Sequence, residues 1–182
     1  APYVVAQNTG AFLEIPGLLD EQHTISTRAD TDAYLARLEA YAAQLDGETG
    51  RLKAAAAQKV IAPDFLLDKT LAQLRIARGQ EIPKWTLVES IARRGAAFPG
   101  VAAQAEKIAR EKIAPALDRQ IAELDAHRRR ATADAGVWKL PRGDEYYGWA
   151  LRARPPRARP PTRSTSAARK SCASCSRAWM PS

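Results

Sequence analysis

Apolar residues recur at intervals of three and four along most of the chain, and this spacing limits the possible folds more than any other feature. It continues from Asp30 to Arg130, whereas alternating runs of β-branched residues are nearly absent. The sequence therefore predicts an all-α fold of long amphipathic helices, with no sheet beyond a short pairing near the N-terminus. Residues 1–25 contain two prolines and two glycines, and there the sequence predicts extended chain or short helices.

Capping residues, prolines and glycines mark the helix ends in the first half of the chain. Thr27, with Asp30 three residues later, predicts the start of a first helix that runs to about Lys59. A second helix is predicted from Pro63 to Gly79, because proline is favoured in a first turn and glycine after a last one. This second helix carries the apolar residues Phe65, Leu66, Leu67, Leu71 and Leu74.

Three more helical segments are predicted in the second half. The first spans Trp85 to Arg94 and ends at Gly95. The second spans Val101 to about Arg130, and Pro115 should kink it, since a proline in a helix interior costs about 3 kcal/mol. A turn then leads to a last helical start, Asp144 to Arg152.

The net positive charge comes almost entirely from the last thirty residues. The net charge is +8, yet seven of the 28 Lys and Arg residues lie in residues 153–182, which contain no acid, and the other 21 face all 20 acidic residues. The sequence therefore divides into a helical N-terminal part, residues 1–152, and a disordered basic tail, residues 153–182. The first part is almost neutral, so its charge does not indicate an anionic partner.

The composition of the tail also suggests a change of reading frame. It lacks Ile, Leu, Val, Phe and Tyr and is rich in Arg, Pro, Ala and Ser, as expected of GC-rich DNA read in a wrong frame. Permitted codons for Arg154 to Ser182, read two bases along, give TTTRTTPDEVHERGTEELRQLQSRMDAI, which has the pattern of a capped amphipathic helix. We therefore expect an out-of-frame tail after about residue 153. A genuine low-complexity tail is the alternative.

Several segments of the helical part resemble one bacterial family. They are PYVVAQNTGAF (Pro2 to Phe12), IPGLLDEQHTI with ADTDAYLARLEAY (Ile15 to Tyr41), APDFLLDKTL (Ala62 to Leu71) and LPRGDEYYGWALR (Leu140 to Arg152). Together they resemble the bacterial domain of unknown function 885 family, which looks like a distant relative of zinc metallopeptidases. The string recovered from the shifted frame also resembles the next segment of this family's sequences.

The resemblance implies a zinc-dependent hydrolase of the peptidase kind, acting on a peptide-like substrate, that is periplasmic or otherwise exported. The metal signature of the family, His-Glu-x-x-Pro-Gly-His, lies far downstream and does not occur in this chain. We therefore expect no catalytic, cofactor-binding or metal-binding residue here, with zinc belonging to the parent protein. The expected partner is the missing C-terminal part of that parent, and this fragment is expected to be inactive.

The histidines and cysteines are weak candidates for metal ligands. His23 and His127 are far apart in the sequence, and neither has another ligand at a suitable spacing. His127 lies near the end of a long predicted helix, where cations complement the helix dipole. Cys172 and Cys175 form at best half of a zinc ribbon, with no second pair.

Aromatic residues give two further expectations. Asp144 to Tyr147 could border the cleft of the parent, although a helix N-terminus with acids in its first turn and tyrosines packed beneath is the simpler interpretation. Trp85, Trp138 and Trp149 are expected in the core.

An alternative function class is a non-enzymatic helical binding module whose basic tail contacts nucleic acid or another anionic surface. Specific nucleic-acid recognition is not expected, and neither is a membrane span, because no run of about 18 apolar residues occurs.

If the chain is truncated, helices such as Val101 to Leu124 should leave apolar surface bare.

Overall fold

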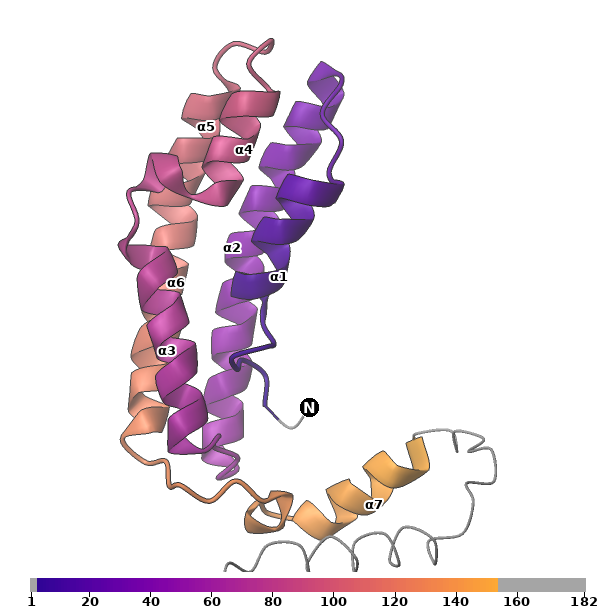
Figure 1. The fold of residues 1–182 in the computed structure, drawn as a ribbon, viewed down its shortest axis with the longest axis vertical. Coiled ribbons are helices and arrows are strands. Elements are labelled where there is room, and N and C mark those ends of the chain that lie inside the picture. Colours follow the sequence, from indigo (N-terminus) through magenta and orange to yellow (C-terminus); the bar gives the residue numbers. More distant parts are fainter. Residues whose placement is uncertain (1–2, 154–182) are drawn as a thin grey trace, which may run out of the picture. The chain divides into compact units, whose positions relative to one another are not determined.

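The structure is a computed structural model that describes residues 3–153, and in this part it is helical throughout apart from loops and one isolated bridge between Ala6 and Thr9 (Figure 1). The all-α prediction is confirmed. In chain order the elements are α1 (Ala11–Gly17), the π-helix η1 (Leu18–Gln22), α2 (Arg28–Ala57), α3 (Asp64–Gly79), the 3-10 helix η2 (Ile82–Lys84), α4 (Thr86–Arg94), α5 (Val101–Ile108), the π-helix η3 (Ala109–Ile113), α6 (Ala114–Arg128), the 3-10 helix η4 (Val137–Lys139) and α7 (Gly143–Ala153).

The chain forms two compact units, Ala1–Gly143 and Asp144–Ser182. In the first unit α2 and α6 lie side by side, α1 packs on α2, α3 packs on α6, and α4 packs on α5 (Figure 1). The described part of the second unit is the helix α7, whose first turn carries Asp144 and Glu145 as expected.

The α2 and α6 helices run parallel in a constant register. Lys112 Nζ of η3 lies 2.6 Å from Glu39 Oε1, and Arg119 Nη2 of α6 lies 2.8 Å from Asp46 Oδ2. Both pairs join residues 73 positions apart. A constant offset between two helices means that they run in the same direction.

The α2 helix begins with the predicted capping box. The side chain of Thr27 accepts a hydrogen bond from Asp30 N at 3.2 Å, and Asp30 Oδ2 accepts one from Thr27 N at 2.8 Å. The helix continues through Gly47 and Gly50, as predicted, although each glycine costs about 1 kcal/mol relative to Ala. Packing along α6 supplies the free energy that local propensity lacks.

Pro115 is accommodated by a widened helical turn. Pro115 has no N–H to donate, and the turn before it is the π-helix η3, where Ala114 N–H bonds to Ala109 O, five residues back. The predicted helix from Val101 to Arg130 therefore exists as α5, η3 and α6 in succession. Pro16 lies inside α1, and the π-helix η1 begins two residues after it.

The core of the first unit is a continuous apolar cluster drawn from all of its longer helices. Its fully buried members include Tyr34, Leu38 and Leu45 of α2, Leu74 of α3, Ile91 of α4, Ile113 of η3 and Leu124 of α6. Full burial of such a side chain contributes about 1.5 to 3 kcal/mol. The predicted helices α2, α3 and α4 all contribute buried apolar side chains to this cluster.

Some predictions about burial are wrong. Trp85 is buried, but Trp138 and Trp149 are 71% and 58% exposed, because the described residues provide no packing partner that covers their rings. Val101 to Leu124 does not leave a bare apolar face, since its large apolar side chains pack into the bundle. The predicted tail, residues 153–182, lies outside the described residues except for Ala153.

Candidate functional site

A pocket of about 330 Å³ opens between α1 and α3. The α1 helix packs on α2 and α4, whereas α3 packs on α6. Between α1 and α3, residues of α2, η3 and α6 form the floor of the pocket. Three groups of residues line the pocket: Phe12 and Pro16 from α1; Gln73, Ile76, Ala77, Gln80, Trp85, Thr86 and Leu87 from α3 and the segment after it; and Tyr41, Ile113 and Leu117 from α2, η3 and α6.

The wall formed by the segment after α3 is held by two side-chain hydrogen bonds. Trp85 Nε1 donates to Gln80 O at 3.1 Å, and the hydroxyl of Tyr34 donates to Leu87 O at 2.8 Å. Burial raises the pKa of Tyr34 to about 12, so this hydroxyl keeps its proton and remains a donor. These two hydrogen bonds fix the segment after α3 against α2 and hold the pocket wall in place.

The α1 wall is anchored by a buried carboxylate of α2. Glu48 is 4% exposed, and its Oε1 accepts a hydrogen bond from Ala11 N at 3.0 Å. Its Oε2 accepts one from Gln120 Nε2 at 3.2 Å. Gly10, just before α1, has φ +133°, a conformation that other residues rarely adopt, and it brings Ala11 N to the carboxylate.

Tyr41 is the ionisable group among the residues that line the pocket. Burial, with a further contribution from the charge of Glu48, raises the pKa of Tyr41 well above its ordinary value. Its hydroxyl is therefore protonated at neutral pH and does not supply a charge.

The chemistry of the lining limits what the pocket can bind. Its members are apolar or aromatic side chains, two amides, Gln73 and Gln80, and the hydroxyls of Thr86 and Tyr41. A charged ligand would lose its hydration without gaining a counter-ion from these groups. The site therefore favours a neutral, mainly apolar group that fits the low end of ordinary ligand-pocket volumes.

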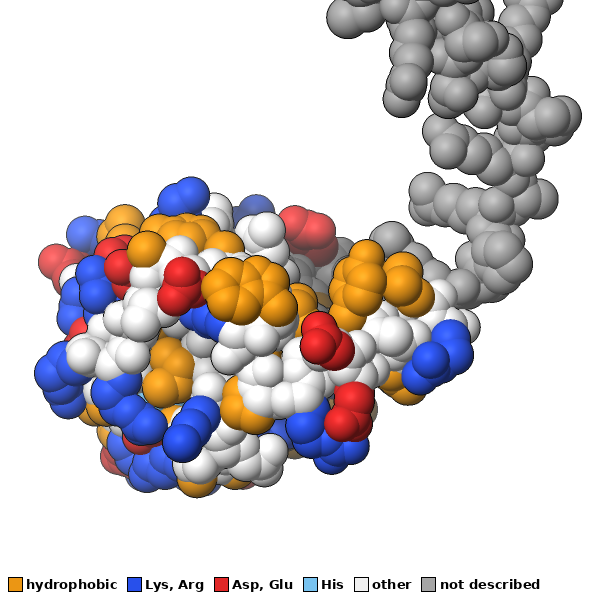
Figure 2. All heavy atoms as spheres, turned by 90° about the horizontal axis from the view of Figure 1, so that it is seen from below, with side chains coloured by type: hydrophobic (Ala, Val, Ile, Leu, Met, Phe, Trp, Pro, Cys, Tyr) orange, Lys and Arg blue, Asp and Glu red, His pale blue; other side chains and the backbone are white. Residues whose placement is uncertain are grey.

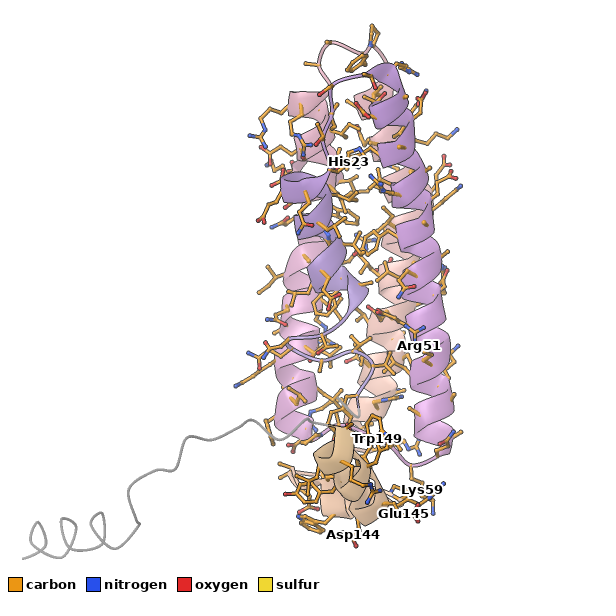
Figure 3. All side chains as sticks on the ribbon, turned by 90° about the vertical axis from the view of Figure 1, so that its right-hand side faces the viewer. His23, Arg51, Lys59, Asp144, Glu145 and Trp149 are labelled. Carbon is orange, nitrogen blue, oxygen red and sulfur yellow. The ribbon has the colours of Figure 1, made fainter. Side chains whose placement is uncertain are left out.

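His23 lies near the end of the bundle at which α2 begins (Figure 3), and both of its ring nitrogens are engaged. Arg37, which can only donate, approaches Nδ1, so the proton is on Nε2, which donates to Asp30 O at 3.0 Å. The ring also stacks edge-on against Tyr34 at 5.1 Å. His23 is thus a bridge between η1 and α2, and neither nitrogen offers a lone pair to a metal.

Arg94 of α4 closes the same end of the bundle. Its guanidinium donates to Leu19 O and to Ser90 Oγ, both at 3.1 Å, and also to the carbonyls of Asp20 and His23. These carbonyls lie at the end of η1, where intrahelical partners are lacking. Arg94 therefore stabilises the fold around His23.

His127 is buried at the opposite end, close to the end of α6. Its Nε2 lies 3.3 Å from Glu123 Oε1 but is not aligned for a hydrogen bond. Burial lowers the pKa of His127, and the charge of Glu123 opposes this effect. The adjacent cavity measures about 10 Å³, which is room for at most about one water molecule. This environment is that of a structural histidine.

An opening of about 330 Å³ at the lower end of the bundle is lined by several cations. Lys59, Arg130 and Lys139 border it together with Asp134, and Arg130 donates to Ala56 O at 3.4 Å near the end of α2. Cations at this position complement helix C-termini. In Figure 2 the blue and red side chains at this end are mixed rather than gathered into one patch.

The side of the bundle between α2 and α5 carries a wider groove of about 490 Å³. Glu39, Lys107, Glu111 and Lys112 border it, and Lys112 Nζ lies 2.6 Å from Glu39 Oε1. Since charges of both signs compensate each other here, the groove gives no preference for a charged ligand.

Within residues 3–153, no group of three or more His, Cys, Asp or Glu side chains could hold a metal ion. Cys172 and Cys175 lie outside the described residues. No described helix is long and apolar enough to cross a membrane.

The structure does not bring the sequence candidates together. His23 and His127 lie at opposite ends of the first unit, and Asp144 to Tyr147 belong to the second. Tyr147 is 59% exposed, so the expectation that the tyrosines pack beneath the helix is wrong for this residue.

Sequence patterns missed the pocket because its lining comes from four separate stretches of the chain. One signal could have indicated it. Phe65 and Ile76 lie on the opposite side of α3 from Leu67, Leu71 and Leu74, and Phe65 is 48% exposed, so α3 carries apolar residues on two sides.

Comparison with known proteins gives one family and one fold. The sequence profile of the family described as "Bacterial protein of unknown function (DUF885)" matches residues 1–177. The match includes residues 154–177, so it lends no support to a change of reading frame at residue 153. No curated protein matches the chain.

Among solved structures, a putative lipoprotein from Colwellia psychrerythraea resembles this chain with a TM-score of 0.75 at 19% identity. The similarity covers 84% of this chain and 27% of the other, so this chain spans only about a quarter of the length of that relative. At this identity the likeness shows a shared fold.

Proposed function

Because the chain belongs to the bacterial family DUF885, we propose that it is the helical N-terminal part of a longer zinc-dependent hydrolase of the peptidase kind. The observation that supports this most is the unequal coverage of the solved relative, 84% of this chain against 27% of that one. A bundle of this size is one part of a protein of that length. The metal and the hydrolytic chemistry belong, in this proposal, to the remainder.

The side chains of the bundle support a structural role for this part. His23 is engaged in hydrogen bonds, His127 is buried beside Glu123, and the most buried carboxylate among residues 3–153, Glu48, anchors α1. Residues 3–153 lack a metal-ligand group. The proposed function of the bundle is therefore to form one wall of the parent protein and to support the part that carries the zinc.

We further propose that the parent is exported, to the periplasm or to another extracytoplasmic location, and acts on a peptide-like substrate. The description of the solved relative as a putative lipoprotein supports export. Fractionation of cells that express the parent gene tests this proposal. Recovery of the protein with the cytosolic fraction would contradict it.

The origin of residues 153–182 is a separate proposal. If the tail is out of frame, the encoding DNA contains a frame change near codon 153, and the corrected frame continues toward His-Glu-x-x-Pro-Gly-His. Sequencing the DNA through and beyond this point tests it. An unbroken frame that ends at Ser182 would overturn both the frame change and the proposal that the chain is a fragment.

The activity itself is tested on the protein encoded by the corrected frame. We expect that protein to bind about one zinc ion and to hydrolyse a peptide-like substrate, and we expect substitution of either motif histidine to abolish both. The chain of residues 1–182 serves as the control and should do neither. Salt-sensitive nucleic-acid binding by residues 1–182 that is lost on deleting residues 153–182, with no zinc-dependent hydrolysis by the longer protein, would instead favour a binding module.

A further inference from the structure

An apolar stripe on α3 leads to the pocket between α1 and α3. Phe65 and Ile76 are separated by about three helical turns and share one face of α3, with the exposed Ala72 between them. Their side chains are 48% and 69% exposed, and Ile76 also lines the pocket. Exposed apolar side chains therefore extend beyond the pocket along about 16 Å of helix, with Lys69 between them.

The stripe and the pocket together fit a helix better than a small molecule. A pocket of about 330 Å³ holds one or two large side chains, whereas the stripe extends well past its mouth. Amphipathic helices bind to such surfaces with apolar anchors spaced three and four residues apart. Because the lining of the pocket has no charged side chain, the anchor that enters it must be neutral and apolar.

A second copy of the chain fits the stripe less well. Lys69 lies near the middle of the stripe, between Phe65 and Ile76. An antiparallel, two-fold pairing of the stripe with itself would bring Lys69 close to the same residue of the other copy, and like charges in contact disfavour association. A partner helix without this symmetry avoids the repulsion.

The solved relative indicates where such a helix comes from. This chain accounts for 27% of that protein, so most of its polypeptide lies outside the shared bundle. We propose that the pocket and the α3 stripe are the docking site for a helix from the remainder of the parent protein, which inserts one neutral, apolar side chain between α1 and α3. This inference rests on the proposed function, since it names the surface by which the bundle joins the rest of the hydrolase.

The test uses the chain of residues 1–182, labelled with ¹⁵N, and two small probes of similar shape. N-acetyl-leucinamide presents an apolar side chain on a peptide-like backbone, and the N-acetyl amide of aspartate presents a charged one. We expect saturable amide shifts at Gln73, Ala77 and Leu87 with the leucine probe, and at least about tenfold weaker binding of the aspartate probe.

Substitution at one exposed alanine should block the site. Ala77→Trp fills the pocket from its rim, and the shifts should disappear; Ala43→Trp, on the exposed face of α2, is the matched control and should retain them. If Ala77→Trp alters the helical circular dichroism spectrum, Ile76→Asp replaces it, because a charge at this exposed rim should also abolish binding of the leucine probe.

Four results would overturn the docking site. Three concern the probes: no saturable shifts, equal binding of the two probes, or shifts that persist in both Ala77→Trp and Ile76→Asp. The fourth is a closed dimer that Ala77→Trp but not Ala43→Trp converts to monomers, which would identify a second copy as the occupant. All four leave the zinc hydrolase proposal standing. Conversely, a corrected frame without the metal motif would remove that proposal without changing the probe result.

Discussion

The two sides of α3 differ sharply, and the difference shows which surface of the bundle is complete. On the side facing α6, Leu67, Leu71 and Leu74 are buried, and three Arg–Asp pairs flank them: Arg75 with Asp125, Arg78 with Asp118 and Arg128 with Asp68. The opposite side carries the exposed Phe65 and Ile76 and borders an uncharged pocket. The first side packs against α6, whereas within residues 3–153 the side chains of Phe65 and Ile76 on the second side remain exposed.

The largest expected effect separates these two sides directly. Leu74→Ala removes a fully buried side chain and should destabilise the fold by about 2 to 5 kcal/mol, while Ile76→Ala, at a 69% exposed position, should change stability by at most about 0.5 kcal/mol. Urea unfolding followed by circular dichroism measures both. Equal losses for the two variants would mean that the outer side of α3 is already packed in this chain.

The anchor of α1, the other wall of the pocket, gives the next largest effect. Glu48→Ala leaves Ala11 N and Gln120 Nε2 buried without acceptors, which should cost about 1 to 3 kcal/mol. Glu48→Gln keeps one acceptor oxygen and should cost less. Hydrogen exchange resolves where stability is lost, and in Glu48→Ala we expect the exchange rate to increase more in α1 than in α6. Uniform loss across the bundle would contradict a local anchoring role.

The ion pairs on the inner side of α3 should contribute little each. Arg78 Nε lies 2.9 Å from Asp118 Oδ1, but the two side chains are 34% and 53% exposed, so solvent screening limits the pair to about 0.2 to 1 kcal/mol. A double-mutant cycle with Arg78→Ala and Asp118→Ala, repeated at 1 M salt, measures this coupling. A coupling that is independent of salt would show that the pair is less solvated than its exposure indicates.

The smallest effect concerns pH. Because the folded pKa of His127 is lowered, the unfolded chain binds its proton first, and stability should fall as pH drops below about 6.5. His127→Gln does not titrate and should remove this part of the pH dependence. Exposed Asp68, whose pKa is lowered by Arg128, should lose its stabilising contribution only at more acidic pH, toward and below its ordinary value. Identical pH profiles for His127→Gln and the unchanged chain would contradict the assignment.

The features that were predicted from the sequence are those specified by nearby residues. Thr27 and Asp30 form the capping box within one turn, and Gly79 and Gly95 mark the ends of α3 and α4 as expected. Such signals act over three or four residues, so a single sequence contains them in full. Pro115 predicted a local disturbance of its helix, but not that a π-helical turn would absorb it.

The features that were missed depend on residues distant in the sequence. The outward position of Phe65 follows from which side of α3 packs on α6, and the helix has apolar residues on both sides. The exposure of Trp138 and Trp149 similarly depends on partners, not on residue type. The pocket could not be predicted because its walls, α1 and α3, are distant in the sequence, and no sequence pattern indicates that the fold places them side by side.

The metal content of the purified chain of residues 1–182 tests most directly whether the bundle supports the hydrolase without carrying its zinc. After incubation with zinc and removal of unbound metal, we predict well below one zinc ion per chain by elemental analysis. The zinc content of His23→Ala and His127→Ala should equal that of the unsubstituted chain. One tightly bound zinc per chain that is lost in either histidine variant would contradict this role and would place a metal site within the bundle itself.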